Sequence, residues 1–242
     1  MISNFYKKGI IHFIGIGGIG MSGIAELMLN LGYKIQGSDR STNNNIKNLQ
    51  RRNVQIFLNH KEKNVKNVNA VVYSSAIKKN NPEILAAKKK SIPIVSRADM
   101  LAELMRDKHS IAVAGSHGKT TTTSLVGSIL QECKKDPTIV IGGIINSMLN
   151  NNRLGLGKWM VVEADESDGS FLRLPHDINI ITNIDREHLD YYKNMKNLIS
   201  AFKKFATNIP FYGYSIICLD SQNSKKIAEQ INTRKIITFD YK

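Results

Sequence analysis

The stretch that decides the fold reads Ile111-Ala112-Val113-Ala114-Gly115-Ser116-His117-Gly118-Lys119-Thr120-Thr121. Its apolar first residues predict a β-strand, and its glycines predict a loop. The apolar residues that recur at helical spacing from there to Glu132 predict a helix. In such a strand-loop-helix, backbone N–H groups surround phosphates, Lys119 supplies positive charge and the Thr120 hydroxyl can bind Mg²⁺. Val113 stands where the general pattern has its first glycine. We therefore expect a phosphate-binding loop that is shorter in glycine than most.

Two strands that follow this loop end in groups able to bind a cation. The strand predicted at 160–163 ends in Glu163, and the strand predicted at 178–182 runs into a polar segment that contains His188. Ligands gather at the carboxyl ends of parallel strands, where oxygen and nitrogen donors can hold magnesium. For His188 the alternative of a hydrogen-bonded structural histidine stays open.

A second glycine turn, at 15–20, lies near the beginning of the chain. It follows a predicted strand at 10–15, precedes a predicted helix at 20–31, and is followed by Asp39 at the end of the next strand. This arrangement fits the dinucleotide fingerprint, in which glycines permit close approach to a pyrophosphate. The same geometry can hold the diphosphate of a nucleotide sugar. The turn therefore predicts a diphosphate ligand and leaves a nicotinamide-dependent oxidoreductase as the alternative.

Strand-like and helical patterns alternate along the whole chain, which predicts an α/β fold with mostly parallel strands. The polar cluster at 106–109 is the best boundary, giving units at 1–107 and 108–242. The remaining strands are expected at 34–38, 70–74, 92–95, 111–114, 138–141 and 215–219, and a strand pattern at 236–239 predicts an exposed sheet edge.

The composition argues against a nucleic-acid-binding or membrane protein. The net charge is +14, but the 25 lysines are scattered and 24 asparagines accompany them, which indicates a bias of the whole surface. No apolar stretch approaches membrane-spanning length. The two cysteines, Cys133 and Cys218, lie in apolar stretches without metal spacing, so we expect both in the core. A reducing cytoplasm is the consistent location.

Taken together, several motifs resemble those of the Mur ligases in order and spacing, over essentially the whole chain. Within that family the resemblance is to the members that add L-alanine to UDP-N-acetylmuramate. It implies a Rossmann-like N-terminal domain followed by an incomplete P-loop-type α/β ATP-binding central domain. The motifs are the segments 12–26, 37–39, 73–77, 81–83, 114–123, 163–168, 182–184 and 188–190.

The reaction implied by the resemblance begins with transfer of the ATP γ-phosphoryl group to the lactyl carboxylate of UDP-N-acetylmuramate. The amine of L-alanine then attacks the acyl phosphate, and phosphate leaves as the amide forms. A carboxylate is a poor electrophile until phosphate gives it a leaving group, and positive charge must offset the phosphoryl oxygens. ATP and Mg²⁺ are the implied cofactors.

The resemblance also implies site residues. Lys119, Glu163 and His188 would be catalytic, and Thr120, Glu163 and His188 would bind the metal. The expected ATP-binding residues are Gly115, Ser116, His117, Gly118, Lys119, Thr120 and Thr121. The expected UDP-sugar residues are Gly15, Gly17, Gly18, Gly20, Asp39, His60, Ser74, Ser75 and Arg97. Two departures occur: Ser116 replaces the usual threonine, and Asp185-Arg186-Glu187 replaces a segment that the family runs as Glu-x-Asp.

The family's third domain and the end of its second are absent from these 242 residues. Because closure over the site depends on that domain, we expect this chain alone not to complete the ligation. A non-catalytic nucleotide-sugar-binding fragment and half of a split ligase are the alternatives, the latter with a complementing C-terminal fragment as partner.

Overall fold

The computed structural model describes residues 9–74, 76–142, 144–146 and 155–241, and its main division into two compact units falls between Leu101 and Ala102. Helix α5 (Arg97–Met105) crosses this division. Because a helix is a poor place to divide a chain, we keep the boundary after residue 107 as our proposal.

The first unit is built on a parallel five-stranded sheet with the order β3-β2-β1-β4-β5. This is the order of a doubly wound dinucleotide-binding sheet, and it confirms the predicted Rossmann-like architecture. One strand, β3, was not expected from the sequence, and β5 lies slightly later than predicted. The strands are β1 (Ile10–Ile14), β2 (Lys34–Asp39), β3 (Gln55–Leu58), β4 (Ala70–Tyr73) and β5 (Ile94–Ser96).

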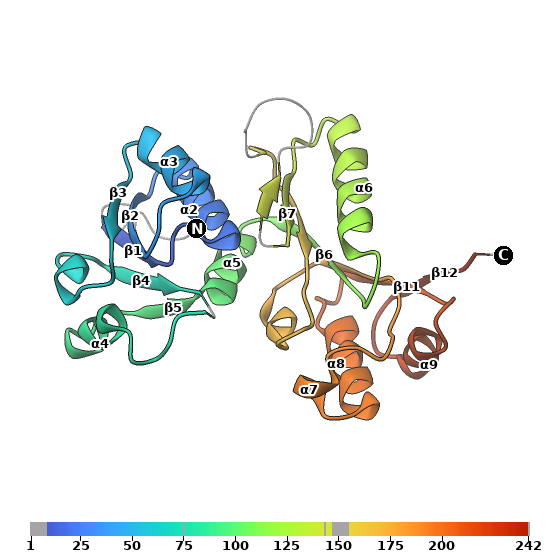
Figure 1. Ribbon diagram of the computed structural model, residues 1–242. Coiled ribbons are helices and arrows are strands. Elements are labelled where there is room, and N and C mark those ends of the chain that lie inside the picture. The colour runs from blue at the N-terminus through green and yellow to red at the C-terminus, as the bar shows by residue number, and fades with distance from the viewer. Residues whose placement is uncertain (1–8, 75, 143, 147–154, 242) are drawn as a thin grey trace. The chain divides into compact units, whose positions relative to one another are not determined.

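Helices lie on both sides of this sheet, with α2 and α3 on one side and α4 on the other (Figure 1). Two of them begin at asparagine caps: the side chains of Asn43 and Asn81 accept hydrogen bonds from backbone N–H groups of the first turn. Gly32, with φ of +87°, follows the end of α2, as the sequence predicted. The helical elements are α2 (Ile19–Asn30), α3 (Asn44–Arg51), the 3₁₀ helix η1 (Glu62–Val65) and α4 (Pro82–Lys89).

A seven-stranded sheet has the order β12-β11-β10-β6-β9-β7-β8, and its strands from β12 to β7 are parallel and belong to the second unit. The predicted strand at 236–239 is present and forms one edge of the sheet. The strands are β6 (His109–Ala114), β7 (Thr138–Ile141), β8 (Ile144–Asn146), β9 (Trp159–Glu163), β10 (Ile178–Ile181), β11 (Tyr214–Cys218) and β12 (Ile236–Phe239).

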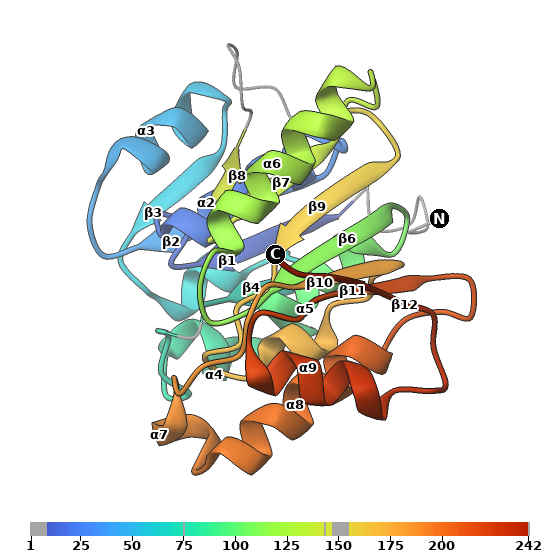
Figure 2. The same cartoon turned by 90° about the vertical axis from the view of Figure 1, so that its right-hand side faces the viewer.

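Helix α6 covers one face of this sheet, and α8 and α9 lie on the other (Figure 2). Helix α6 spans the predicted residues. Cys218 is buried as expected, but the expectation for Cys133 was wrong: it is exposed because it follows the last residue of α6. The helical elements are α6 (Lys119–Glu132), the 3₁₀ helix η2 (Ser170–Arg173), α7 (Leu189–Tyr192), α8 (Met195–Thr207) and α9 (Gln222–Gln230).

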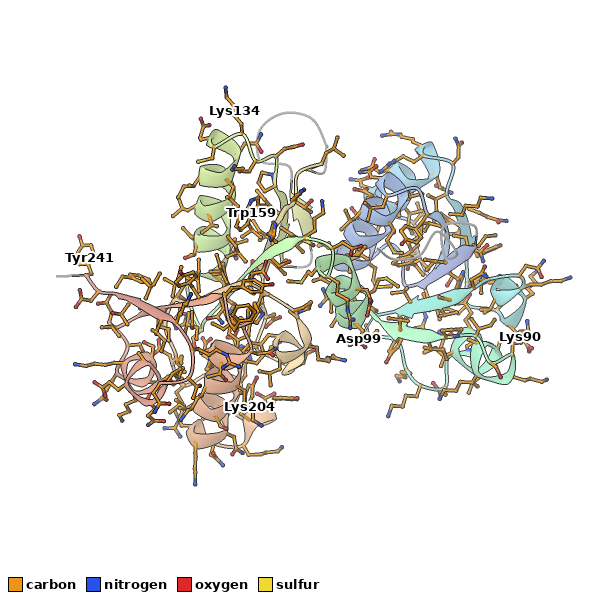
Figure 3. The ribbon with its side chains drawn as sticks, turned by 180° about the vertical axis from the view of Figure 1, so that it is seen from behind. Lys90, Asp99, Lys134, Trp159, Lys204 and Tyr241 are labelled. Carbon is orange, nitrogen blue, oxygen red and sulfur yellow. The ribbon has the colours of Figure 1, made fainter. Side chains whose placement is uncertain are left out.

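The basic side chains are distributed over separate elements. Figure 3 shows Lys90, Lys134 and Lys204 directed outward, and all three are exposed. Within the described part of the chain, no helix has both the length and the apolar character needed to cross a membrane.

Candidate functional site

The glycine loop of the second unit connects β6 to α6. It is anchored to the segment after β10: the Ser116 N–H donates to the Asn183 carbonyl at 3.1 Å, and the His117 N–H donates to Asn183 Oδ1 at 2.8 Å. Gly115 and Gly118 have φ of +142° and +78°, which side chains disfavour. The loop therefore opens directly onto the first turn of α6, whose N–H groups have no intrahelical acceptors and attract anions.

The Lys119 ammonium is folded back over this loop. Its Nζ donates to the Gly115 carbonyl at 2.6 Å, to the Ser116 carbonyl at 3.2 Å and to Glu166 Oε1 at 3.0 Å. The side chain is only 15% exposed. The positive charge is thus held in place at the loop before any ligand binds.

Glu163 ends β9 and lies opposite Val113 of the neighbouring strand β6. Its Oε2 accepts from the Thr120 hydroxyl at 3.1 Å and from the Gly142 N–H at 3.1 Å. Two of the three residues predicted to bind metal, Thr120 and Glu163, are therefore in contact beside the glycine loop.

His188, the third predicted ligand, lies in a group with Glu166 and Glu187, whose donor atoms are all within 4.8 Å of one another. Its Nε2 is 3.7 Å from Glu166 Oε1. The sequence pointed to the acidic turn at 165–168 but could not select Glu166, which is 1% exposed. Glu166 Oε2 is buried and has no hydrogen-bond partner among the residues that the structure describes. Such a carboxylate, with imidazole and a second carboxylate, fits a hard divalent cation.

Burial raises the pKa of Glu166, although the neighbouring Lys119 opposes this shift. A buried carboxylate without full compensation is energetically unfavourable unless a cation or a proton joins it. Glu166 therefore contacts the Lys119 ammonium and also belongs to the group of donor side chains with Glu187 and His188.

The remaining predicted ATP residues belong to the same loop and helix start. Thr121 is in the first turn of α6. His117 is exposed, and its Nε2 lies 3.5 Å from Asp185 Oδ2 and 3.8 Å from Glu187 Oε1. The segment 185–187, which departs from the family pattern, thus keeps two carboxylates next to the loop. The other departure, Ser116 in place of the larger threonine, accepts a hydrogen bond from the Asp185 N–H at 2.8 Å.

The first unit contains a pocket of about 1160 Å³ at the carboxyl ends of its strands. Among the predicted UDP-sugar residues, Gly20 lies in the first turn of α2 and Arg97 begins α5, and neither lines this pocket. Ser75 lies outside the described residues. The predicted residues that line the pocket are Gly15, Gly17, Gly18, Asp39, His60 and Ser74.

Asp39 fixes the glycine turn at the pocket. Its Oδ2 accepts from the Gly17 N–H at 2.8 Å and its Oδ1 from the Arg40 N–H at 2.7 Å. The side chain thus holds the turn in shape, in addition to lining the pocket. Arg40, Lys61 and Lys78 also line it and supply positive charge for an anionic ligand.

A buried polar cluster, which we call the Glu83 cluster, lies next to the pocket. It consists of His12, Ser38, His60, Asn64 and Glu83. Burial alone would raise the pKa of Glu83, but the His12 ring 3.3 Å away and hydrogen bonds from Ser38 and Asn64 outweigh it and leave the pKa below its ordinary value. The carboxylate is therefore ionised at neutral pH although the residue is 0% exposed. Sequence reasoning assigned no role to Glu83.

The lowered pKa of Glu83 predicts how the stability of the first unit depends on pH. The carboxylate stabilises the fold above its ordinary pKa of 4.5, and this contribution is lost as the pH falls through the lower folded-state value. At pH 7 we expect Glu83→Gln to lower the free energy of unfolding by about 2–4 kcal/mol. The difference should shrink below pH 4.5. Amide hydrogen exchange in β1 and β4 measures this difference in the free energy of unfolding.

The matched control is Glu103→Gln, because Glu103 forms an exposed ion pair with Arg106 in which the side chains are 45% and 66% exposed. Such pairs contribute at most about 1 kcal/mol. Equal protection of β1 and β4 in wild type and Glu83→Gln at pH 7 would contradict the assignment of an ionised, stabilising Glu83.

The two units match two protein-family models. Residues 10–109 match the catalytic domain of the Mur ligase family, and residues 113–242 match the Mur ligase middle domain. The chain belongs to the Mur ligase family, which confirms the resemblance seen in the sequence.

The chain is also similar to individual members of the family. The chain is 54% identical over 231 residues to the UDP-N-acetylmuramate–L-alanine ligases of Brucella anthropi and Brucella ovis, covering 96% of this chain and 49% of each relative. The crystal structure of the UDP-N-acetylmuramate–alanine ligase of Thermotoga maritima is 31% identical with a TM-score of 0.79, covering 97% of this chain and 53% of that one. The chain thus spans about half the length of these three relatives.

A further solved structure shows the fold alone. It is the UDP-N-acetylmuramate:L-alanyl-γ-D-glutamyl-meso-diaminopimelate ligase of Neisseria meningitides, 20% identical with a TM-score of 0.82, covering 96% of this chain and 78% of that chain.

Proposed function

We propose that this chain supplies the UDP-sugar-binding and ATP-binding units of a ligase that joins L-alanine to the lactyl carboxylate of UDP-N-acetylmuramate, in the synthesis of peptidoglycan precursors. The observation that carries the proposal is the placement of Lys119, which is held at the phosphate loop by two loop carbonyls and Glu166. The identity to L-alanine ligases supports the choice of substrates.

In the second unit, the phosphate loop and the start of α6 would bind the ATP phosphates, and Lys119 would offset the charge of the transferring phosphoryl group. Thr120 and Glu163 would hold one magnesium ion. Glu166, which contacts Lys119, and His188 offer donors for a further cation. Bound Mg²⁺ would supply Lewis-acid stabilisation of the phosphoryl oxygens.

In the first unit, the turn at Gly15 to Gly18 and the cations around the pocket would bind the diphosphate of UDP-N-acetylmuramate. With the carboxylate activated as an acyl phosphate, the amine of L-alanine would form the amide. Because the proposed reaction consumes ATP and a nucleotide sugar, we propose the cytoplasm as its location, with neither nucleic acid nor membrane as partner.

The alternative is that the chain is a non-catalytic nucleotide-sugar-binding fragment or half of a split ligase, completed by a C-terminal fragment. This alternative is kept because the chain spans about half of its curated relatives.

Phosphate release tests the proposal. The chain is supplied with ATP, Mg²⁺ and UDP-N-acetylmuramate, with and without L-alanine, and with and without the remaining half of the Brucella anthropi relative. We expect release that requires both L-alanine and the UDP-sugar, and only in the presence of the added half. Release that requires neither substrate, or a chain that binds neither ATP nor the UDP-sugar, would refute the proposed function.

A further inference from the structure

The carboxylate of Glu83 is the most heavily engaged buried charge in the first unit, yet the proposed ligation assigns it no task. Its Oε1 accepts from Asn64 Nδ2 at 2.7 Å and lies 3.3 Å from His12 Nε2. Its Oε2 accepts from the Ser38 hydroxyl at 2.6 Å and lies 3.1 Å from His60 Nδ1. Four elements, β1, β2, α4 and the start of η1 with its preceding loop, thus meet at one carboxylate.

A buried charge of this kind is seldom retained for stability alone. Removing charged groups from water is costly, and well-packed apolar residues often replace them without loss of stability. The Glu83 cluster differs from a purely internal network because one of its members, His60, also lines the pocket. The cluster therefore connects the buried charge to the ligand side of the unit.

The two ring nitrogens of His60 face different surroundings. Nδ1 lies 3.1 Å from Glu83 Oε2 and 3.0 Å from Ser38 Oγ. An ionised carboxylate can only accept a hydrogen bond, and the Ser38 hydroxyl proton is already directed to Glu83, so Nδ1 must carry the proton. The described residues provide no hydrogen-bond partner for Nε2. The ring is therefore oriented from behind, and Nε2 is available to a ligand.

We propose that Glu83 is a positioning residue for nucleotide-sugar binding: it accepts the Nδ1–H of His60 and fixes the ring, so that Nε2, protonated from solvent as the ligand binds, donates a hydrogen bond to the diphosphate. The inference rests on the proposed UDP-sugar function of this pocket. A carboxylate that accepts a hydrogen bond from one ring nitrogen commonly sets the protonation and the orientation of a functional imidazole. The neighbouring Arg40, Lys61 and Lys78 give the pocket the charge that a diphosphate requires.

A double-mutant cycle distinguishes positioning from a merely structural role. The variants are Glu83→Gln, His60→Asn and their combination, and the probes are UDP and uridine, titrated calorimetrically into the full chain. Asparagine is the matched choice because its amide nitrogen reproduces Nδ1 and can still donate to Glu83, while nothing replaces Nε2. Each single variant should weaken UDP binding about tenfold to a hundredfold, as expected for a hydrogen bond to a charged group.

Uridine binding should change little, because uridine lacks the phosphates. The double variant should bind UDP about as weakly as His60→Asn alone, because Glu83 acts through His60. Independent, additive losses in the double variant would overturn the proposal, as would a Glu83→Gln protein that binds UDP normally. Failure of the wild-type chain to bind UDP would instead refute the proposed function of the pocket.

A spectroscopic measurement keeps the proposal testable even where Glu83→Gln fails to fold. Two-bond ¹H–¹⁵N correlation spectra of the wild-type chain report which His60 ring nitrogen carries the proton, and His60→Asn identifies the signals. We expect a protonated Nδ1 in the ligand-free chain, and protonation of Nε2 as well when UDP binds. A bare Nδ1, or an Nε2 signal unchanged at saturating UDP, would overturn the proposal.

Discussion

Replacing Lys119 with alanine is expected to lower L-alanine-dependent phosphate release by at least about 10³-fold in an intact ligase that carries these two units. The ammonium is already held at the phosphate loop, with Nζ 2.6 Å from the Gly115 carbonyl oxygen and 3.0 Å from Glu166 Oε1. Its loss removes a preorganised charge from the transferring phosphoryl group. Binding of the UDP-sugar should be unchanged, because the pocket for it is in the other unit.

Lys134→Ala is the matched control, since Lys134 is an exposed residue just beyond the far end of the same helix. Turnover of this variant should stay close to that of the wild type. Near-normal turnover of Lys119→Ala would mean that the glycine loop is structural, and the ATP assignment would have to be withdrawn.

Gly115→Ala should have the second large effect, on the folding of the second unit. A β-carbon at Gly115 would lie 2.1 Å from Thr182 Oγ1 and 3.0 Å from the Asn183 carbonyl oxygen, at a φ of +142°. The combined clash and backbone strain should lower the free energy of unfolding by about 3 kcal/mol or more. Urea denaturation followed by the fluorescence of Trp159, the chain's single tryptophan and part of β9, measures the loss.

Gly118→Ala isolates the backbone contribution, because φ is +78° but, chain neighbours aside, no atom of the described residues lies within 4 Å of the added β-carbon. This substitution should lower the free energy of unfolding by about 1 kcal/mol. Equal stability losses in the two variants would show that the contact between the loop and Thr182 is not the constraint that requires glycine at 115.

Elements with strong local signals could be predicted from the sequence. The strand-loop-helix around Lys119 has an apolar run, glycines and an apolar helical stripe, and the helix begins and ends where expected. The strand β3 was missed because Gln55–Leu58 is short and only partly buried. The position of Glu163 at the end of β9, where it contacts Thr120, followed from the rule that ligands gather at the carboxyl ends of parallel strands.

Contacts that depend on tertiary structure could not be predicted. The acidic turn at 165–168 contains three carboxylates, and its sequence does not show that Glu166 is the buried one beside Lys119. The Glu83 cluster gathers residues up to 71 positions apart, from His12 to Glu83, with no periodic pattern between them. Burial and partner choice at both sites follow from the packing of strands and helices.

The central claim is that the first glycine turn serves a nucleotide sugar and the second loop serves ATP. Thermal unfolding of the chain with UDP-N-acetylmuramate, ATP with Mg²⁺, or NADH added separately tests it most directly, because a ligand that binds only the folded state stabilises it in proportion to ln(1 + [L]/Kd). We predict a rise in melting temperature with the UDP-sugar and with ATP, and none with NADH. A clear rise with NADH and none with the UDP-sugar would contradict the account.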